Sequence, residues 1–140
     1  MMETPMDRID KMLNHDLFLY HLGRNNAAEA DRRFCRHSMV HFLDVARIGT
    51  IIALEEGLKI DREWIYAAAL LHDCGKHEQY ENGIPHEQAS ARIAPEILKA
   101  CGFNDEETGV IVTAISKHRD PEAAKEKNLN GILYRADKAS

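Results

Sequence analysis

The segment Leu70–Lys76, LLHDCGK, places His72 directly before Asp73 at the end of an apolar run. Adjacent residues of a helix point about 100° apart, so both side chains reach one point only if that point lies beside the helix. A metal ion is the usual reason for such convergence, and Gly75 is typical of the residue just past a helix end. For these residues alone, a capped helix end with an exposed aspartate is the better explanation, so the rest of the chain decides.

Composition limits the classes of protein to which the chain can belong. The 140 residues, of which only 6% are aromatic, predict one domain with a mostly aliphatic core. The net charge of -5 argues against an extended nucleic-acid surface but leaves room for a small anionic substrate. No stretch approaches the ~18 apolar residues of a membrane span, the first residues do not resemble a signal peptide, and the 3 widely spaced cysteines indicate free thiols. We therefore expect a cytoplasmic protein that has no membrane partner.

Apolar periodicity, helix caps and glycines predict an all-α bundle of five to seven helices. After a first helix that begins near Thr4, we place helices at about 16–31, 37–56, 61–73, 86–101, 104–118 and 129–139. Pro95 is expected to kink or split its helix, because proline lacks an N–H donor. The polar segment 77–85 is expected to be a loop beside the site with His77 exposed, and the charged segment 122–128 to be exposed as well.

Four predicted helices each place one ionisable residue on the inward apolar stripe: His41, His86, His118 and Asp137. A lone histidine on an apolar face is more often a hydrogen-bonded core residue, and His118 at a helix end is also favoured as a cation by the helix dipole. Asp137 continues the stripe of Leu133, where a carboxylate is costly unless it is paired or bound to a metal. By contrast, His15 and His21 lie among polar residues, and we interpret both as surface histidines.

Together with His72 and Asp73, these four residues make a set of candidate metal ligands. Imidazole and carboxylate donors suit divalent transition metals such as iron, manganese, zinc, cobalt or nickel rather than calcium. One tetrahedral ion needs fewer ligands than the set provides, whereas two ions bridged by a carboxylate would use them all. Such a site suits phosphoryl chemistry, because the ions clamp the phosphate, generate hydroxide and stabilise the leaving oxygen. Lys76 would add positive charge to that site.

The joint pattern resembles the HD-domain superfamily of metal-dependent phosphohydrolases. His41, followed by the segment 45–47, is similar to the first-ligand helix of that superfamily, Leu70–Lys76 to its signature, and the segment 136–138 to its last-ligand helix. The resemblance runs from about Cys35 to the end of the chain. It implies a helical bundle around a central metal site.

This resemblance implies a role for each matching residue: core metal ligands His41, His72, Asp73 and Asp137, and second-metal ligands His86 and His118. Asp73, as the bridge, and Lys76 would be catalytic. Apart from the resemblance, we expect His37, Lys76 and Arg119 to contact phosphate. The extra histidines are similar to those of a subgroup with dinuclear sites, which includes enzymes that cleave diadenosine tetraphosphate and HD-GYP phosphodiesterases of cyclic dinucleotides. No Gly-Tyr-Pro follows His118, so we rank cyclic-dinucleotide cleavage low.

We expect one HD-type domain over residues 1–140, with N-terminal helices in 1–34 and the metal-binding core in 35–140. The chain stops soon after Asp137 without a helix cap, as expected of a piece of a longer protein. The expected function is hydrolysis of a phosphate ester or anhydride, of a nucleotide in particular, with one or two divalent transition-metal ions. Two alternatives stay open, a non-catalytic metal- or nucleotide-binding regulator and a di-iron oxygenase of the same superfamily. A homodimer is also compatible with the sequence.

Overall fold

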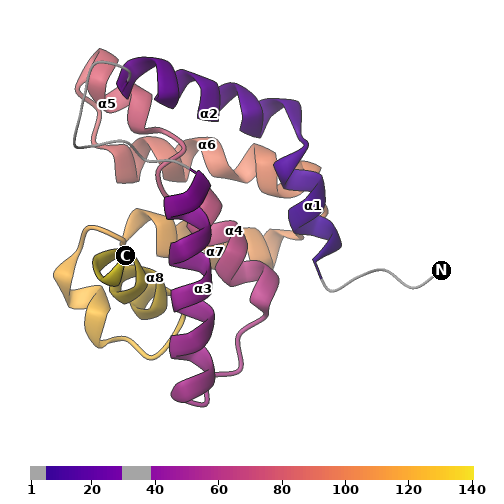
Figure 1. Cartoon of the computed structure of the whole chain (residues 1–140), viewed down its shortest axis with the longest axis vertical. Helices are drawn as coiled ribbons and strands as arrows, with labels where there is room; N and C mark the ends of the chain where they lie inside the picture. Colours follow the sequence, from indigo (N-terminus) through magenta and orange to yellow (C-terminus); the bar gives the residue numbers. More distant parts are fainter. Residues whose placement is uncertain (1–5, 30–38) are drawn as a thin grey trace.

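The computed structural model describes residues 6–29 and 39–140, and the regular elements in these ranges are all helical (Figure 1). In chain order they are α1 (Asp7–Leu13), α2 (Asp16–Glu29), α3 (Met39–Glu55), α4 (Arg62–Leu71), α5 (Lys76–Asn82), α6 (His86–Ala100), α7 (Asp105–Ser116), the 3-10 helix η1 (Pro121–Lys125) and α8 (Leu129–Ala139). The predicted all-α fold is confirmed. None of the described helices is long and apolar enough to cross a bilayer. His37 and the predicted helix start near Thr4 lie outside the described residues.

Helix α3 packs against both α4 and α8, while α6 packs against α5 and α7, and α2 covers α5 (Figure 1). The buried core is mostly aliphatic, as expected. Gly49 allows the close approach around α3, because a Cβ there would lie 3.0 Å from the Ile65 side chain and 3.1 Å from that of Ile132. The buried face of α3 therefore runs through Gly49, whereas Ile48 and Ile52, which share an apolar stripe with His41 in the sequence, are only half-buried.

Two predicted helix starts, those of α4 and α7, are confirmed by their caps. The Asp61 side chain accepts a hydrogen bond from the Glu63 backbone N–H at the start of α4. Asn104 and Glu107 form a reciprocal capping box at the start of α7. These caps fix where α4 and α7 begin, and thus the register of the residues that the two helices carry towards the centre of the bundle.

Arg8 fastens the first helix to the bundle. Its Nε lies 2.7 Å from Oε1 of Glu63 on α4, and its Nη1 lies 2.9 Å from Oε1 of Glu107 on α7. The guanidinium also lies over the Phe103 ring, 4.1 Å from the centroid. One arginine therefore ties α1 to both α4 and α7.

Predictions about three segments were wrong in whole or in part. Of the two outcomes expected at Pro95, a kink or a split, the split does not occur: α6 continues from His86 to Ala100, because burial of neighbours such as Ile97 offsets the lost backbone hydrogen bond. The expected loop 77–85 is mostly the helix α5, which ends at Gly83 with a φ of 72°. Within 122–128, η1 buries Ala123, so that segment is not exposed throughout.

His77 is buried rather than exposed, because α2 packs over α5. Its Nε2 lies 2.9 Å from Nδ1 of His21, and the two rings are stacked. Burial, together with the nearby His77, lowers the pKa of the half-buried His21 to about 4. The surface interpretation of His21 is therefore wrong, and the two neutral rings share one hydrogen bond between α2 and α5.

Candidate metal centre

The apolar helix α4 ends at Leu71, and the chain then turns sharply before α5. In this turn His72 is 0% exposed and Asp73 is 2% exposed, so two ionisable side chains are buried at one place. Buried polar groups of this kind need partners, because burial of an isolated charge is costly. The elements packed around the turn must provide those partners.

Neighbouring helices hold the backbone of the turn at three points. Gly75 has a φ of −97° and does not end α4 as predicted; it is required because α6 passes so close that a Cβ would lie 2.6 Å from Ser90 N. Ser90 Oγ accepts a hydrogen bond from Gly75 N at 2.9 Å. From α2, Asn25 donates through Nδ2 to Asp73 O at 2.9 Å and accepts at Oδ1 from His77 N at 2.8 Å.

A first group of donors combines α3, the turn and α8. Asp137 Oδ1 lies 3.3 Å from Nε2 of His41 and 3.4 Å from Nε2 of His72. Asp73 Oδ2 lies 3.3 Å from the same nitrogen of His72. One ligand atom each from His41, His72 and Asp73 lies within 4.8 Å of the others. This group could hold a divalent metal ion.

A second group lies on the other side of Asp73. Its Oδ1 is 3.3 Å from Nε2 of His86 at the start of α6 and 3.5 Å from Nε2 of His118, which follows α7. The two histidine nitrogens are 3.1 Å apart, and both side chains are buried. Asp73 therefore belongs to both groups and directs one carboxylate oxygen into each, as a carboxylate that bridges two ions would.

The far ring nitrogen of three of these histidines faces a carbonyl oxygen. The pairs are His72 Nδ1 with Ala69 O at 2.5 Å, His118 Nδ1 with Ile115 O at 2.7 Å, and His86 Nδ1 with Gln79 Oε1 at 2.7 Å. A carbonyl oxygen only accepts, so each Nδ1 carries a hydrogen, and each ring in its neutral form directs the lone pair of Nε2 into the centre. Metal-ligating histidines typically show this arrangement.

The donor set fits a metal ion in each group. In the second group, neutral His86 and His118 would present two lone pairs 3.1 Å apart, which repel unless a cation lies between them. Donors that bind one ion at tetrahedral or octahedral angles lie about 3.0–3.5 Å from each other. The donor–donor distances given above range from 3.1 to 3.5 Å.

The charges of the first group also favour a cation. Burial alone would lower the pKa of His72, but the carboxylates of Asp73 and Asp137 outweigh it and raise that pKa to about 9. Burial would raise the pKa of Asp137, yet hydrogen bonds with His41 and His72 hold it well below its usual range. Without a metal, a protonated His72 thus offsets the two carboxylates, and a divalent ion would offset them with greater charge.

Comparison with known proteins identifies the family of the chain. The family model described as HD domain matches residues 39–140. The chain belongs to the HD domain family. An uncharacterized protein of Clostridium beijerinckii is 49% identical over 135 residues, which cover 96% of this HD chain and 84% of that protein. A crystal structure of a predicted HD superfamily hydrolase from an uncultured Thermotogales bacterium matches with a TM-score of 0.66 and 28% identity. That match covers 86% of the present chain and 66% of the other, so this HD chain spans just under two thirds of the solved protein.

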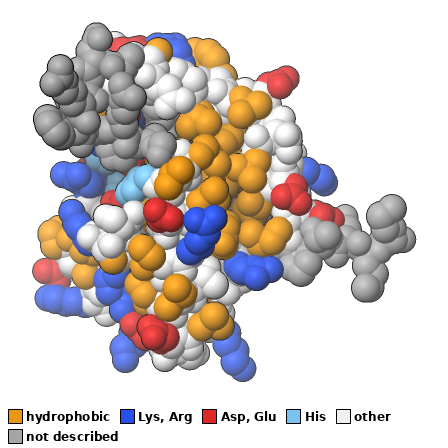
Figure 2. Space-filling view, viewed as in Figure 1, with side chains coloured by type: hydrophobic (Ala, Val, Ile, Leu, Met, Phe, Trp, Pro, Cys, Tyr) orange, Lys and Arg blue, Asp and Glu red, His pale blue; other side chains and the backbone are white. Residues whose placement is uncertain are grey.

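The structure places two of the three predicted phosphate-contacting residues of the HD domain near the second group. His37 lies outside the described residues, Lys76 is half-buried at the start of α5, and Arg119 is exposed after α7. Burial, assisted by the charges of Lys76 and Arg119, lowers the pKa of His86 to about 3. Figure 2 shows histidine side chains at the surface of one face, with Lys or Arg side chains close by. The contact of His37, Lys76 and Arg119 with phosphate stays a prediction.

Three polar residues that support the turn 72–75, called the HD turn below, and its ligands were not singled out in the sequence: Asn25, Gln79 and Ser90. Asn25 lies 48 residues before its partner Asp73, and no local pattern links two positions so far apart. Gln79 lies 7 residues before His86, with the turn at Gly83 between them. This short separation is the one feature of the sequence that could have indicated their contact. Polar residues of these types are common on exposed helix faces, so the residue type alone does not indicate a role at the metal centre.

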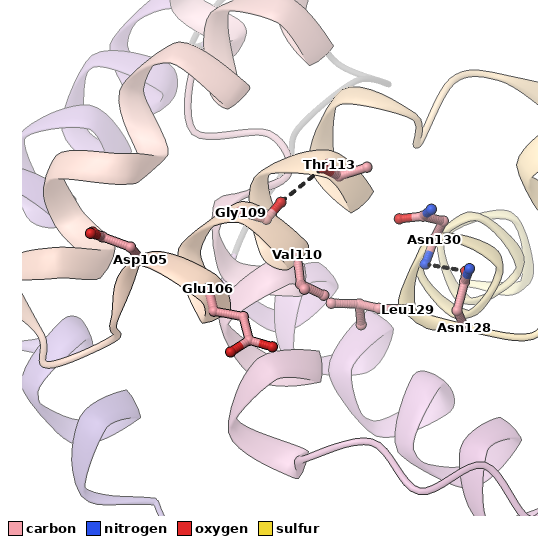
Figure 3. Close-up of a pocket in the computed structure, with 8 residues that line it drawn as sticks. All are labelled: Asp105, Glu106, Gly109, Val110, Thr113, Asn128, Leu129 and Asn130. Atoms are coloured by element: carbon pink, nitrogen blue, oxygen red, sulfur yellow. Dashed lines mark hydrogen bonds between the residues drawn. The ribbon is translucent and has the colours of Figure 1, made fainter.

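A separate hollow of about 570 Å³ lies between α7 and the start of α8 (Figure 3). It is lined by Asp105, Glu106, Gly109, Val110, Thr113, Asn128, Leu129 and Asn130. Val110 and Leu129 face each other in this hollow, and its described lining residues include no histidine or cysteine. It lacks the donors of the metal centre, so the hollow and the candidate HD chemistry are in different places.

Proposed function

We propose that this HD domain is a metal-dependent phosphohydrolase that acts on a phosphate ester or anhydride of a nucleotide. The observation that carries the proposal is the shared carboxylate of Asp73, which directs one oxygen into each of two groups of donors. Two cation positions this close together suit displacement at phosphorus, where both the attacking and the leaving oxygen carry negative charge. The solved relative is described as a predicted HD superfamily hydrolase, which is consistent with the proposal.

The proposed ligands of the first ion are His41, His72, Asp73 and Asp137, and those of the second are Asp73, His86 and His118. When bound, the ions would polarise the phosphoryl group and supply hydroxide at neutral pH. Asp73 fixes the separation of the two positions because its backbone is held by Asn25 from another helix. The protonated Nδ1 atoms of the histidines keep the opposite ring nitrogens directed inward.

A nucleotide suits the centre because its phosphate groups are multiply charged and would meet cations from the protein as well. Arg119 directly follows His118, and Lys76 begins α5, the helix whose Gln79 contacts His86, so both belong to the elements around the second group. There they would stabilise an anionic leaving group or a further phosphate. We therefore assign the second group to the side on which the substrate extends away from the reacting phosphorus.

The test starts with elemental analysis of protein purified without chelator, followed by a panel of nucleotide esters and anhydrides with added manganese, cobalt or iron. We expect at least one ion to be bound and phosphate or nucleotide to be released from at least one substrate. Asp73→Ala should lower metal content and reduce turnover at least about a hundredfold, because it removes a ligand from both groups. Asp10→Ala, an exposed aspartate on α1, is the matched control and should change neither quantity.

Three results would count against the proposal, each in its own way. If the protein binds no transition metal even after reconstitution, the proposed metal-dependent hydrolysis has no basis. Nucleotide binding without turnover across the panel would favour the regulatory alternative. Oxygen uptake by the reduced iron-loaded protein, with no release of phosphate, would favour the oxygenase.

A further inference from the structure

The two histidines of the second group fix their ring protons differently. His118 follows the end of α7, where the last carbonyls of a helix have no partner within the helix. Its Nδ1 lies 2.7 Å from one of these carbonyls, Ile115 O, which also accepts from the backbone N of His118 at 3.3 Å. His86 is the first residue of α6, where the helix presents N–H groups and no free carbonyls. It therefore needs an acceptor from another element.

Gln79 of α5 provides that acceptor. Its Oε1 lies 2.9 Å from the backbone N of His86 and 2.7 Å from Nδ1 of the same residue. Because the backbone N–H of His86 can only donate, the Gln79 atom that faces it is the amide oxygen and not the amide nitrogen. The same oxygen only accepts, so His86 Nδ1 must carry the ring hydrogen.

The consequence appears at the opposite side of the ring. His86 Nε2 presents a lone pair 3.3 Å from Asp73 Oδ1 and 3.1 Å from His118 Nε2, both of which are also acceptors. In isolation the ring would gain by moving its hydrogen to Nε2, where it could be donated to either neighbour. Gln79 opposes this shift, and the result is a cluster of three acceptors that a cation would satisfy.

We propose that Gln79 is a positioning residue of the second metal site, which selects the Nδ1–H tautomer of His86 and thereby keeps its Nε2 available to an ion. This inference rests on the proposed metal-dependent function. A competing structural role exists, because Oε1 also caps the first turn of α6 through the backbone N of His86. The test must therefore separate tautomer selection from capping.

The first measurement needs no metal. Long-range ¹H–¹⁵N correlation NMR of the metal-free protein reports which nitrogen of each histidine carries the hydrogen. We expect Nδ1–H for His86 in the wild type and in Gln79→Glu, which keeps an acceptor oxygen, and a shift towards Nε2–H in Gln79→Leu. Gln88→Leu, an exposed glutamine on α6, is the matched control and should leave His86 unchanged.

The second measurement is calorimetric titration with Mn²⁺ alone. Gln79→Leu should weaken the second ion about 10- to 100-fold, as loss of a ligand's hydrogen-bond partner does, while the first ion keeps its affinity. Gln79→Glu should restore the second ion. An unchanged tautomer in Gln79→Leu, or an equal loss of the ion in Gln79→Leu and Gln79→Glu, would overturn the proposal, as would a drop in thermal stability with both ions retained. If the tautomer shifts as expected but the wild type binds metal without turnover, the positioning role stands and the proposed hydrolysis fails.

Discussion

Asn25→Ala is expected to destabilise the protein because it removes a side chain that joins α2 to the HD turn. Asn25 is 1% exposed and makes two hydrogen bonds to backbone groups of the turn. Asp73 O would keep a second donor, Lys76 N at 3.0 Å, and would lose only the net value of one hydrogen bond. His77 N would lose the acceptor that Asn25 Oδ1 provides and would bear the full cost of an unpaired buried donor.

The size of the effect follows from these two losses. One net hydrogen bond is worth about 0.5–1.5 kcal/mol and one unpaired buried group costs about 1–3 kcal/mol. The free energy of unfolding should therefore fall by about 1.5–4.5 kcal/mol. For a chain of 140 residues, an unfolding entropy of about 0.3 kcal/mol/K converts this to a Tm lower by about 5–15 °C.

Denaturant and thermal unfolding of the metal-free protein measure this loss, with Asn26→Ala as the control. Asn26 is the exposed neighbour on the same helix, so both variants change helix propensity equally. Amide hydrogen exchange gives a local readout, because the His77 amide should lose protection in Asn25→Ala alone. If the free energies of unfolding of the two variants differ by less than about 0.5 kcal/mol, the range of ordinary surface substitutions, the claim that the two hydrogen bonds of Asn25 support the turn is refuted.

Two further predictions concern the same turn. Gly75→Ala should destabilise the fold by about 1–3 kcal/mol, because its Cβ would lie 2.6 Å from Ser90 N. The control is Gly109→Ala in α7, where the new Cβ meets nothing within 4 Å and should stabilise the fold by about 0.5–1 kcal/mol. Equal effects of the two substitutions in denaturant unfolding would contradict this prediction. Because two carboxylates outweigh burial and raise the pKa of His72 to about 9, the metal-free protein holds a proton there at pH 7, and this stabilisation is lost as pH rises through about 9. The first ion must displace that proton, so its apparent affinity should rise about tenfold per pH unit from pH 7 to about 9. Calorimetry in buffers of different ionisation enthalpy counts the protons released on binding. An affinity that does not vary over this pH range would exclude His72 as a protonated ligand of the first ion.

The candidate ligands could be predicted because each breaks a local rule of the sequence. Asp137 continues an apolar stripe on α8, and His41 does so on α3; such positions demand a partner for an ionisable side chain. The structure brings Asp137 Oδ1 to within 3.3 Å of His41 Nε2, from helices that are far apart in sequence. Helical periodicity was sufficient here, because it assigns each residue a face, and the core faces of one bundle must meet.

The segment after the turn could not be predicted in the same way. The residues of α5 are mostly polar, and no apolar stripe distinguishes this short helix from a loop. What buries His77 is a contact with α2, and what gives Gln79 a role is the start of α6. Both depend on how separate helices pack, which single-sequence periodicity does not report. The roles of the polar residues that support the turn could therefore not be predicted without knowing which helices pack against them.

These contacts also bear on which part of the chain holds the candidate centre together. The match to the HD family begins at Met39, yet Asn25, which holds the backbone of Asp73, lies on α2 before that point. Arg8 of α1 likewise binds Glu63 of α4, the helix that ends at the HD turn. The bridging carboxylate is thus fixed from outside the matched segment as well as from within it. Substitutions on α1 and α2 can consequently alter the separation of the two donor groups without touching any candidate ligand.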